Sequence, residues 1–265
     1  MRAFFSMVKT ALRQQLQYRS AMLAGVFTQV IFGLIYIMVY TAFFDNGKSV
    51  MGGMALGQAV SYVWLSQGTY RMMPWSGVKD VEAMMRDGRI AFELARPMNV
   101  YDMWFARSMA MRTAPLLTNL PIVLLAASLM PKGLRLELSP AWIPLGALSL
   151  MLGMLVSASM TAILTGTYFW TISGRGINRI LPMVGSFCAG NILPLAFFPK
   201  GVRFVLRMLP FASMLDAPLR ILAGTVDVRT ALSVIGLQLF WLAALTVLGR
   251  TVLRAGVKKC MVQGG

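Results

Sequence analysis

The chain alternates long apolar runs with short polar segments. Six of the runs are long enough for a helix to cross a hydrocarbon core of ~30 Å at ~1.5 Å per residue. They lie at about residues 20–43, 51–73, 113–130, 141–170, 180–198 and 230–249. Little sequence remains for a separate soluble domain. The pattern therefore predicts an all-α membrane protein with six transmembrane helices in a single domain, residues 1–265.

Residues 1–19 predict an amphipathic helix that lies in the membrane interface. Apolar side chains recur every three to four positions from Phe4 to Leu16, and Lys9 and Arg13 fall on other faces. Such a helix places its cations near lipid head groups. A cleaved signal peptide would be followed by an A-x-A site, and none follows here. We interpret the segment as retained in the protein.

The stretch after the fifth run has a different pattern from a transmembrane helix. Its cations Lys200, Arg203 and Arg207 alternate with apolar residues, which predicts an interfacial helix that ends at Pro210. A second short helix is expected to follow, with an aspartate and an arginine four positions apart that form an ion pair. These two residues are Asp216 and Arg220.

The longest polar segment, residues 74–112, lies between the second and third runs and is expected to contain a short helix. The apolar face of this helix consists of Val81, Met84 and Met85. Glu82 with Arg86, and Arg89 with Glu93, have the i,i+4 spacing at which opposite charges stabilise a helix. We therefore expect two ion pairs in this segment.

The fourth run contains two interlocked rows of small residues. One row is Ser157, Thr161 and Thr165, and the other is Ala158, Ala162 and Gly166. Small residues four positions apart allow two helix backbones to approach closely. The second row is therefore the expected contact with a neighbouring helix.

One face of the second run is polar. Gln58, Tyr62 and Ser66 are spaced four apart, so they share one face of a helix. Two interpretations remain open for them: hydrogen bonds to a neighbouring helix, or contact with a transported substrate.

Positive charge gathers in alternate segments between the runs. The net charge is +16, and 17 of the 25 Lys and Arg residues fall in the segments that would share a side with the two termini. The positive-inside rule then predicts that both termini lie in the cytoplasm. The cations lie near the ends of the runs rather than on one soluble face, which argues against nucleic-acid binding.

Composition excludes most catalytic classes. The chain is 57% hydrophobic and 13% charged, and it contains no histidine, which removes Ser-His-Asp and Cys-His catalysis and most zinc sites. It has no G-x-x-x-x-G-K-[ST] loop for nucleotide phosphates. The centres of the six runs hold no Asp, Glu, Lys or Arg, whereas ion-coupled transporters usually need such groups at the midplane. We expect no metal or cofactor in this chain, and any transport would take its energy from a partner.

Three stretches of the chain match a family pattern in order and spacing. The first is Arg86–Pro97, with its Gly-x-Ile start and Arg-Pro end; the second consists of Gly190–Pro194, Phe198–Pro199, Leu209–Phe211, Pro218 and Gly224; the third is Val262–Gly265. With these motifs, the chain resembles the permeases of type-2 ABC transporters. It is most similar to the compact permeases that are encoded in pairs beside a separate ATPase.

The resemblance implies a role for each segment. Residues 1–19 correspond to an elbow helix on the cytoplasmic leaflet, and the short helices after the fifth run correspond to outer helices that cap a pathway. Residues 76–95 correspond to a coupling helix that docks in a groove of the ATPase. The implied docking residues are Val81, Met84, Met85, Arg86, Asp87 and Arg89. Because the second and fifth spans line the route in relatives, the implied pathway residues are Gln58, Tyr62, Ser66 and Asn191.

The resemblance also implies an ATP-driven exporter in the bacterial cytoplasmic membrane. Two permeases, identical or sister chains, would enclose the pathway, and two copies of an ABC ATPase would bind ATP and Mg²⁺ below them. The chain itself would catalyse no reaction, and membrane lipids would be its other partners. An ATP-independent channel and a non-transporting scaffold or sensor subunit are the alternatives.

Overall fold

The computed structural model describes residues 2–17, 19–45, 50–73, 78–96, 98–170 and 175–263. These residues form helices and one small β-hairpin, so the all-α membrane class is confirmed. The α-helices are α1 (Arg2–Gln17), α2 (Arg19–Asp45), α3 (Leu56–Thr69), α4 (Lys79–Arg86), α5 (Ile90–Leu94), α6 (Val100–Ser128), α7 (Ile143–Gly166), α8 (Arg175–Cys188), α9 (Lys200–Met208), α10 (Pro210–Met214), α11 (Asp216–Leu222) and α12 (Val228–Gln263). Short 3₁₀ turns are η1 (Tyr70–Met72), η2 (Pro140–Trp142), η3 (Thr167–Phe169) and η4 (Leu195–Phe197), and the hairpin pairs β1 (Val50–Met51) with β2 (Met54–Ala55).

Four helical stretches in the described part of the chain are long and apolar enough to cross a membrane. They are Met22–Phe44 in α2, Val100–Ser128 in α6, Pro140–Phe169 around α7, and Val228–Lys259 in α12. They coincide with the first, third, fourth and sixth predicted runs. The chain is therefore a multi-pass membrane protein.

The second and fifth runs fold into shorter helices than the sequence predicts. α3 and α8 have 14 residues each, or ~21 Å of helix, which is less than the thickness of a hydrocarbon core. The β-hairpin takes up the start of the second run, where Gly52 and Gly53 have positive φ, and Gly190 at φ 78° follows the end of α8. Neither run therefore forms a single helix over its full predicted length, and the six-crossing arrangement stays a prediction.

α6 begins 13 residues before the predicted start of the third run. Its N-terminus is capped by Asn99, whose Oδ1 accepts a hydrogen bond from the backbone N–H of Tyr101 at 2.9 Å. Pro115 and Pro121 lie inside the helix without ending it. α12 likewise continues to Gln263, well beyond the apolar run. Both helices thus extend past their apolar stretches.

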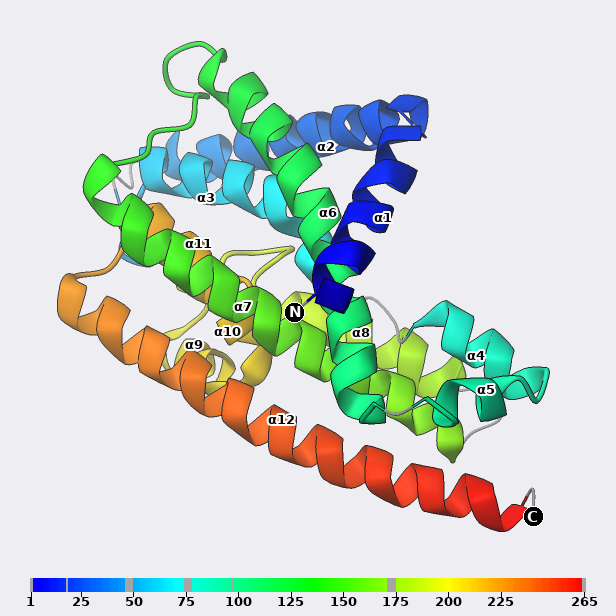
Figure 1. Cartoon of the computed structure of the whole chain (residues 1–265). Helices are drawn as coiled ribbons and strands as arrows, with labels where there is room; N and C mark the ends of the chain where they lie inside the picture. The colour runs from blue at the N-terminus through cyan, green and yellow to red at the C-terminus, as the bar shows by residue number, and fades with distance from the viewer. Residues whose placement is uncertain are drawn as a thin grey trace.

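The long helices connect two ends of the molecule (Figure 1). The hairpin end holds the β-hairpin and the start of α12; there Gln58 at the start of α3 donates to the carbonyl of Gly224 after α11. The C-terminal end holds α4, α5 and the last part of α12, and there Asp102 of α6 pairs with Arg250 of α12 at 3.0 Å. The charge pattern assigns two loops to the same side as the termini. The described residues of these loops lie at the C-terminal end.

The central element is α7, against which α6, α10, α11 and α12 pack. Gly153 of α7 allows the backbone of α10 to approach, because a Cβ there would lie 2.7 Å from the carbonyl oxygen of Met214. Gln238 of α12 donates to the carbonyls of Ser149 and Ser213 at 3.0 and 2.8 Å. The short helices α10 and α11 are therefore inserted among the long ones.

The interfacial pattern after the fifth run is confirmed as a helix, α9. Its apolar side is open, with Phe204 64% exposed. Arg203 turns inward instead, and its Nη1 donates to the carbonyls of Gly52 and Ala196, each at 2.9 Å. Pro210 occupies the first turn of α10, where proline needs no hydrogen-bonded N–H. The proline therefore starts the next helix as well as ending α9.

α1 covers most of the predicted amphipathic segment at the N-terminus and packs against α6. Phe5 and Leu16 expose 65% and 48% of their surface. The position of α1 as an elbow helix in the membrane interface stays a prediction.

Candidate functional site: the α4–α5 hairpin and the polar face of α3

α4 and α5 form a helical hairpin at the C-terminal end of the molecule (Figure 1). Gly88 lies between them at φ 70°, in the left-handed region that glycine adopts without strain. The predicted pair of Glu82 and Arg86 is confirmed, with 2.5 Å between Oε1 and Nη2. Arg89 pairs with Asp87 at 2.6 Å instead of with its predicted partner in α5. Both ion pairs lie on the exposed side of the hairpin.

Glu93, the predicted partner of Arg89, turns toward the transmembrane helices, so that prediction was wrong. The Glu93 side chain is 4% exposed, and its Oε1 lies 3.0 Å from Nη2 of Arg107 in α6. Arg96 approaches its other oxygen at 4.0 Å. A carboxylate this deeply buried stays ionised at low cost only when cations neutralise it. The pair therefore fixes α5 to α6.

An apolar cluster holds the inner face of the hairpin. Val81 is fully buried in the same cluster as Trp104 of α6 and Tyr168 of η3, and Met84 and Met85 are half-buried at the edge of that cluster. Val81 has no exposed surface in this structure, and its predicted docking role stays a prediction. The residue anchors the hairpin to α6 and η3.

The outer face of the hairpin is exposed and carries Arg86, Asp87, Arg89 and Phe92. Phe92 exposes 79% of its surface. Phe92 was not among the predicted docking residues, although it lies two positions after the buried Ile90 and thus on the opposite helix face. An exposed aromatic ring among charged groups is typical of a protein interface.

We expect Glu93→Gln to loosen the hairpin, because the half-buried guanidinium of Arg107 loses its counter-ion. Backbone amides in residues 78–96 should exchange with solvent roughly tenfold faster, as measured by hydrogen–deuterium exchange with mass spectrometry. Glu82→Gln is the matched control, since its partner Arg86 is 42% exposed and the pair contributes little. Equal exchange in the two variants would show that the Glu93–Arg107 pair does not anchor α5.

The hydroxyl row of α7 faces α6 and the start of the hairpin. Thr165 accepts a hydrogen bond from the backbone N–H of Val78, immediately before α4, at 3.0 Å. Ser157 and Thr161 accept from Arg112 of α6. This row therefore contacts both α6 and the chain that leads into α4.

Arg112 lies near the middle of α6 and is 6% exposed. Its Nε donates to the carbonyl of Met72 at 3.1 Å and to Oγ of Ser157 at 3.0 Å, its Nη1 donates to the carbonyl of Ser108 at 2.8 Å, and its Nη2 donates to Thr161. Within the described residues no carboxylate pairs with it. Arg112 precedes the predicted third run, and it lies inside α6 because this helix starts earlier than predicted and α7 supplies hydroxyl acceptors.

The second small-residue row of α7 is buried. Ala158 and Ala162 are 0% exposed. A Cβ at Gly166 would lie 2.8 Å from Cδ2 of Leu253 in α12. At Gly166, α7 and α12 therefore approach closely enough to leave no room for a side chain.

The polar face of α3 makes hydrogen bonds to the chain after α8, to α11 and to the chain after α11. Nε2 of Gln58 donates to the carbonyl of Gly224 at 2.8 Å. The hydroxyl of Tyr62 lies 3.1 Å from the carbonyl of Gly190 and 3.2 Å from Oδ1 of Asp216. These contacts support the packing interpretation for Gln58 and Tyr62, and their lining of a pathway stays a prediction.

Ser66 and Asn191, the other two predicted pathway residues, differ in what they expose. Ser66 is 3% exposed. Asn191 is half-buried, and its Nδ2 donates to Oγ of Ser186 at 3.1 Å. The Oδ1 atom of Asn191 is buried and accepts no hydrogen bond within the described residues. Asn191 therefore keeps an acceptor free in this structure.

Asp216 is the centre of a buried charge cluster. The residue is 0% exposed, and its Oδ2 lies 2.6 Å from Nε of Arg220 and 3.6 Å from Nε of Arg207. Burial lowers the pKa of the Arg207 guanidinium and the charge of Asp216 raises it, and an arginine in a protein stays protonated. The predicted Asp216–Arg220 pair is confirmed. The contributions of Arg207 and Tyr62 were not predicted, because they come from other elements.

A family model described as an ABC-2 family transporter protein matches residues 30–264. The chain belongs to the ABC-2 transporter family. No protein among curated ones matches it. The matched range contains the α4–α5 hairpin, the polar face of α3 and the Asp216 cluster, so these are parts of an ABC-2 permease. Of the three stretches that carry the family resemblance, Pro97 and residues 264–265 lie outside the described residues.

Membership in this family places the chain among type-2 ABC permeases, which are membrane subunits without an ATPase site of their own. Permeases of the ABC-2 family generally work with an ATPase subunit.

Proposed function

We propose that this ABC-2 permease is the membrane-spanning subunit of an ATP-driven exporter in the bacterial cytoplasmic membrane. It pairs with a second permease, identical or a sister chain, and two copies of a separate ATPase bind and hydrolyse ATP with Mg²⁺. Both termini and the α4–α5 hairpin face the cytoplasm. ATP-driven closure of the ATPase dimer moves the hairpins and switches the permeases from inward-open to outward-open.

The observation that carries the proposal is the two-sided character of the α4–α5 hairpin. Its outer face presents Phe92, Arg86 and Arg89 to solvent, as a docking surface requires. Its inner face is joined to α6 through Glu93 and Arg107. The hairpin and α6 therefore move together, so that a displacement of the docked face reaches α6 and is not absorbed by a loop.

The positions of the charges support the proposed orientation. The α4–α5 hairpin lies at the C-terminal end of the molecule with the last part of α12, which carries Arg250, Arg254, Lys258 and Lys259. Cations of this density favour the cytoplasmic side of a membrane. The same end would then meet a cytoplasmic ATPase.

For the pathway, we propose Gln58 and Asn191 ahead of Tyr62 and Ser66. Gln58 is partly exposed and lines a cavity of about 880 Å³ at the end of the molecule that holds the β-hairpin, beside Arg135 and Glu137. Asn191 keeps its Oδ1 unpaired among the described residues. Tyr62 and Ser66 are buried inside the chain, so they reach a cargo only if the helices separate.

The test is affinity purification from native membranes in mild detergent, read by mass spectrometry. We expect a P-loop ATPase in stoichiometric amount with the wild-type chain. Charge reversal of the docking rim, Arg86→Glu with Arg89→Glu, should reduce the recovered ATPase roughly tenfold or more, because complementary interface charges become repulsive. The matched control is Lys132→Glu with Arg135→Glu, which changes two exposed cations in the loop between α6 and α7, away from the α4–α5 hairpin.

Normal ATPase recovery with the Arg86→Glu/Arg89→Glu variant would contradict the docking assignment. A chain that purifies alone, even after gentle cross-linking, would contradict the exporter. The channel alternative predicts ion conduction when the chain is reconstituted by itself, and the scaffold alternative predicts export that is indifferent to changes at Gln58 and Asn191.

A further inference from the structure

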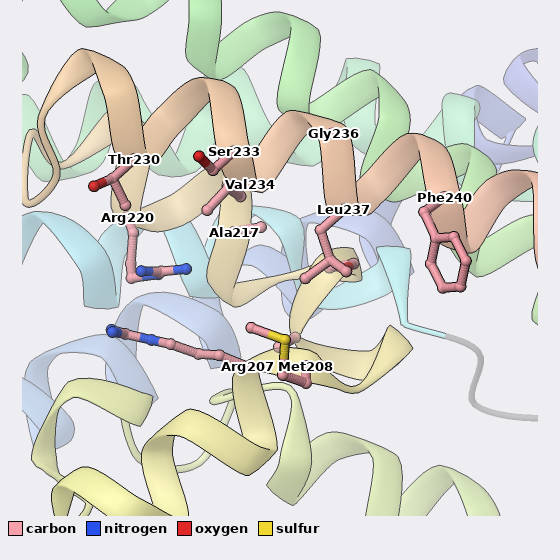
Figure 2. A pocket seen from close by; sticks show the side chains of 12 residues that line it. Arg207, Met208, Ala217, Arg220, Thr230, Ser233, Val234, Gly236, Leu237 and Phe240 are labelled. Atoms are coloured by element: carbon pink, nitrogen blue, oxygen red, sulfur yellow. The ribbon is translucent and has the colours of Figure 1, made fainter.

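A cavity of about 550 Å³ lies between the short helices α9–α11 and the first half of α12 (Figure 2). This volume is in the range of small-molecule binding sites. One part of the cavity is cationic, where Arg207 and Arg220 lie close to each other. Another part is apolar, where Met208, Leu237 and Phe240 line the wall. The cavity is thus amphipathic along its length.

The cationic part carries more positive than negative charge. Arg207 and Arg220 share one carboxylate, Asp216, and the residues that line the cavity include no acidic side chain. The two arginine side chains are only 25% and 7% exposed. The nearby Asp227 is engaged by Thr230, whose hydroxyl donates to its Oδ1 at 2.5 Å. A partly buried site with an excess guanidinium favours an anionic ligand with several acceptor oxygens.

The apolar part opens toward a surface that suits a bilayer. Phe240 is 60% exposed on α12, one of the helices long enough to cross a membrane, and on α9 Phe204 and Val205 are 64% and 59% exposed. A free inorganic anion has no use for this apolar wall. A neutral lipid would leave the excess cation without a partner. Only a ligand with an anionic head and an acyl chain matches both parts.

We propose that this cavity binds an anionic phospholipid, with its phosphate at Arg207 and Arg220 and the start of an acyl chain along Leu237 and Phe240. The bound lipid then holds α9 against α12 at the edge of the permease. Gly236 faces the same cavity, and a Cβ added there meets no atom within 4 Å. The absence of a side chain at this position leaves room for the chain of the lipid.

The experiment uses the purified full chain in detergent, stripped of lipid. Phosphatidylglycerol, phosphatidylcholine or inorganic phosphate is added, and binding is measured by native mass spectrometry together with the shift of the unfolding temperature. We expect phosphatidylglycerol to bind and to raise the unfolding temperature, whereas phosphatidylcholine and phosphate at the same concentration do neither.

Two variants separate the parts of the site. Gly236→Phe should fold, because it replaces a helix-interior glycine next to open space, and it should weaken phosphatidylglycerol binding roughly tenfold by filling the apolar part. Arg207→Gln should weaken it by a similar factor, since one of two charge-assisted contacts is lost. Arg229→Gln is the control: it removes an exposed cation next to Thr230 that does not line the cavity.

The proposal is overturned if the Gly236→Phe and Arg207→Gln variants bind phosphatidylglycerol as well as the Arg229→Gln control does. Equal binding of phosphatidylcholine would overturn the role of the cations. Stabilisation by inorganic phosphate alone, equal to that by the lipid, would reduce the site to a simple anion site and overturn the role of the apolar wall. The inference does not depend on the exporter assignment, because none of these measurements requires an ATPase.

Discussion

Replacing Arg112 with leucine should lower the free energy of unfolding by about 3 kcal/mol. The leucine removes the cost of burying a guanidinium, which favours the variant. It also removes a donor from the carbonyl of Met72 and from the hydroxyls of Ser157 and Thr161 at a buried junction of η1, α6 and α7, where Oγ of Ser157 still donates to the carbonyl of Met72. We expect the lost hydrogen bonds to dominate, because the Thr161 hydroxyl loses its partner at a cost of about 1–3 kcal/mol and the other two acceptors each lose a charge-assisted bond. The measurement is thermal unfolding in detergent, followed through the fluorescence of the buried Trp64 and Trp104.

Three further variants identify the cause. Arg112→Lys keeps the charge but offers one nitrogen in place of three, so its stability should be intermediate. Adding Thr161→Val to Arg112→Leu removes the hydroxyl that lost its donor and should recover part of the loss, whereas Ser157 is kept because it still donates to the carbonyl of Met72. Arg254→Leu, at an exposed position of α12, is the control and should change stability little. A wild-type unfolding temperature for Arg112→Leu would refute the proposed role of this junction.

The class of the fold was readable from the sequence because the apolar runs are long and uninterrupted. The runs in α2, α7 and α12 needed only length and composition. The start of α6 was missed because Asp102, Arg107 and Arg112 interrupt the apolar pattern over its first half. Each of these charges has a partner from a distant part of the chain, such as Arg250 for Asp102, and a local window contains no information about such partners.

The short length of α3 had a signal in the sequence. Gly52 and Gly53 form a dipeptide that favours a tight β-hairpin turn, and both have positive φ in the structure. The hydropathy of the run masks that signal, because Val50 and Met51 continue the apolar stretch. Chain-reversing glycines are therefore stronger evidence for the boundary of this element than its average hydropathy.

In the candidate site, the pattern predicted a helix but not the orientation of its faces. Both Val81 and Phe92 are apolar residues in a short amphipathic segment, yet Val81 is buried and Phe92 is 79% exposed. Helical periodicity shows which residues share a face, and it does not show which face meets the rest of the protein. The contacts of Glu93 with α6 decide this, and they join residues 14 apart through the fold.

The second large effect concerns Asp216. We expect Asp216→Asn to lower the free energy of unfolding by about 3–5 kcal/mol, because it leaves two guanidinium groups, one of them 7% exposed, without a counter-ion. Asp227→Asn is the matched control, since Asp227 is exposed, lies immediately before α12 and accepts a hydrogen bond from Thr230 instead of pairing with an arginine among the described residues. The measurement is thermal unfolding in detergent.

If the positive charges are the cause of the instability, then Asp216→Asn combined with Arg207→Gln should be more stable than Asp216→Asn alone. An anionic lipid in the neighbouring cavity would act in the same direction, so phosphatidylglycerol should stabilise Asp216→Asn more than it stabilises the wild type. Equal stability of Asp216→Asn and Asp227→Asn would instead mean that the hydrogen bonds of α3 with Gly190 and Gly224, and not the charge cluster, hold the short helices in place.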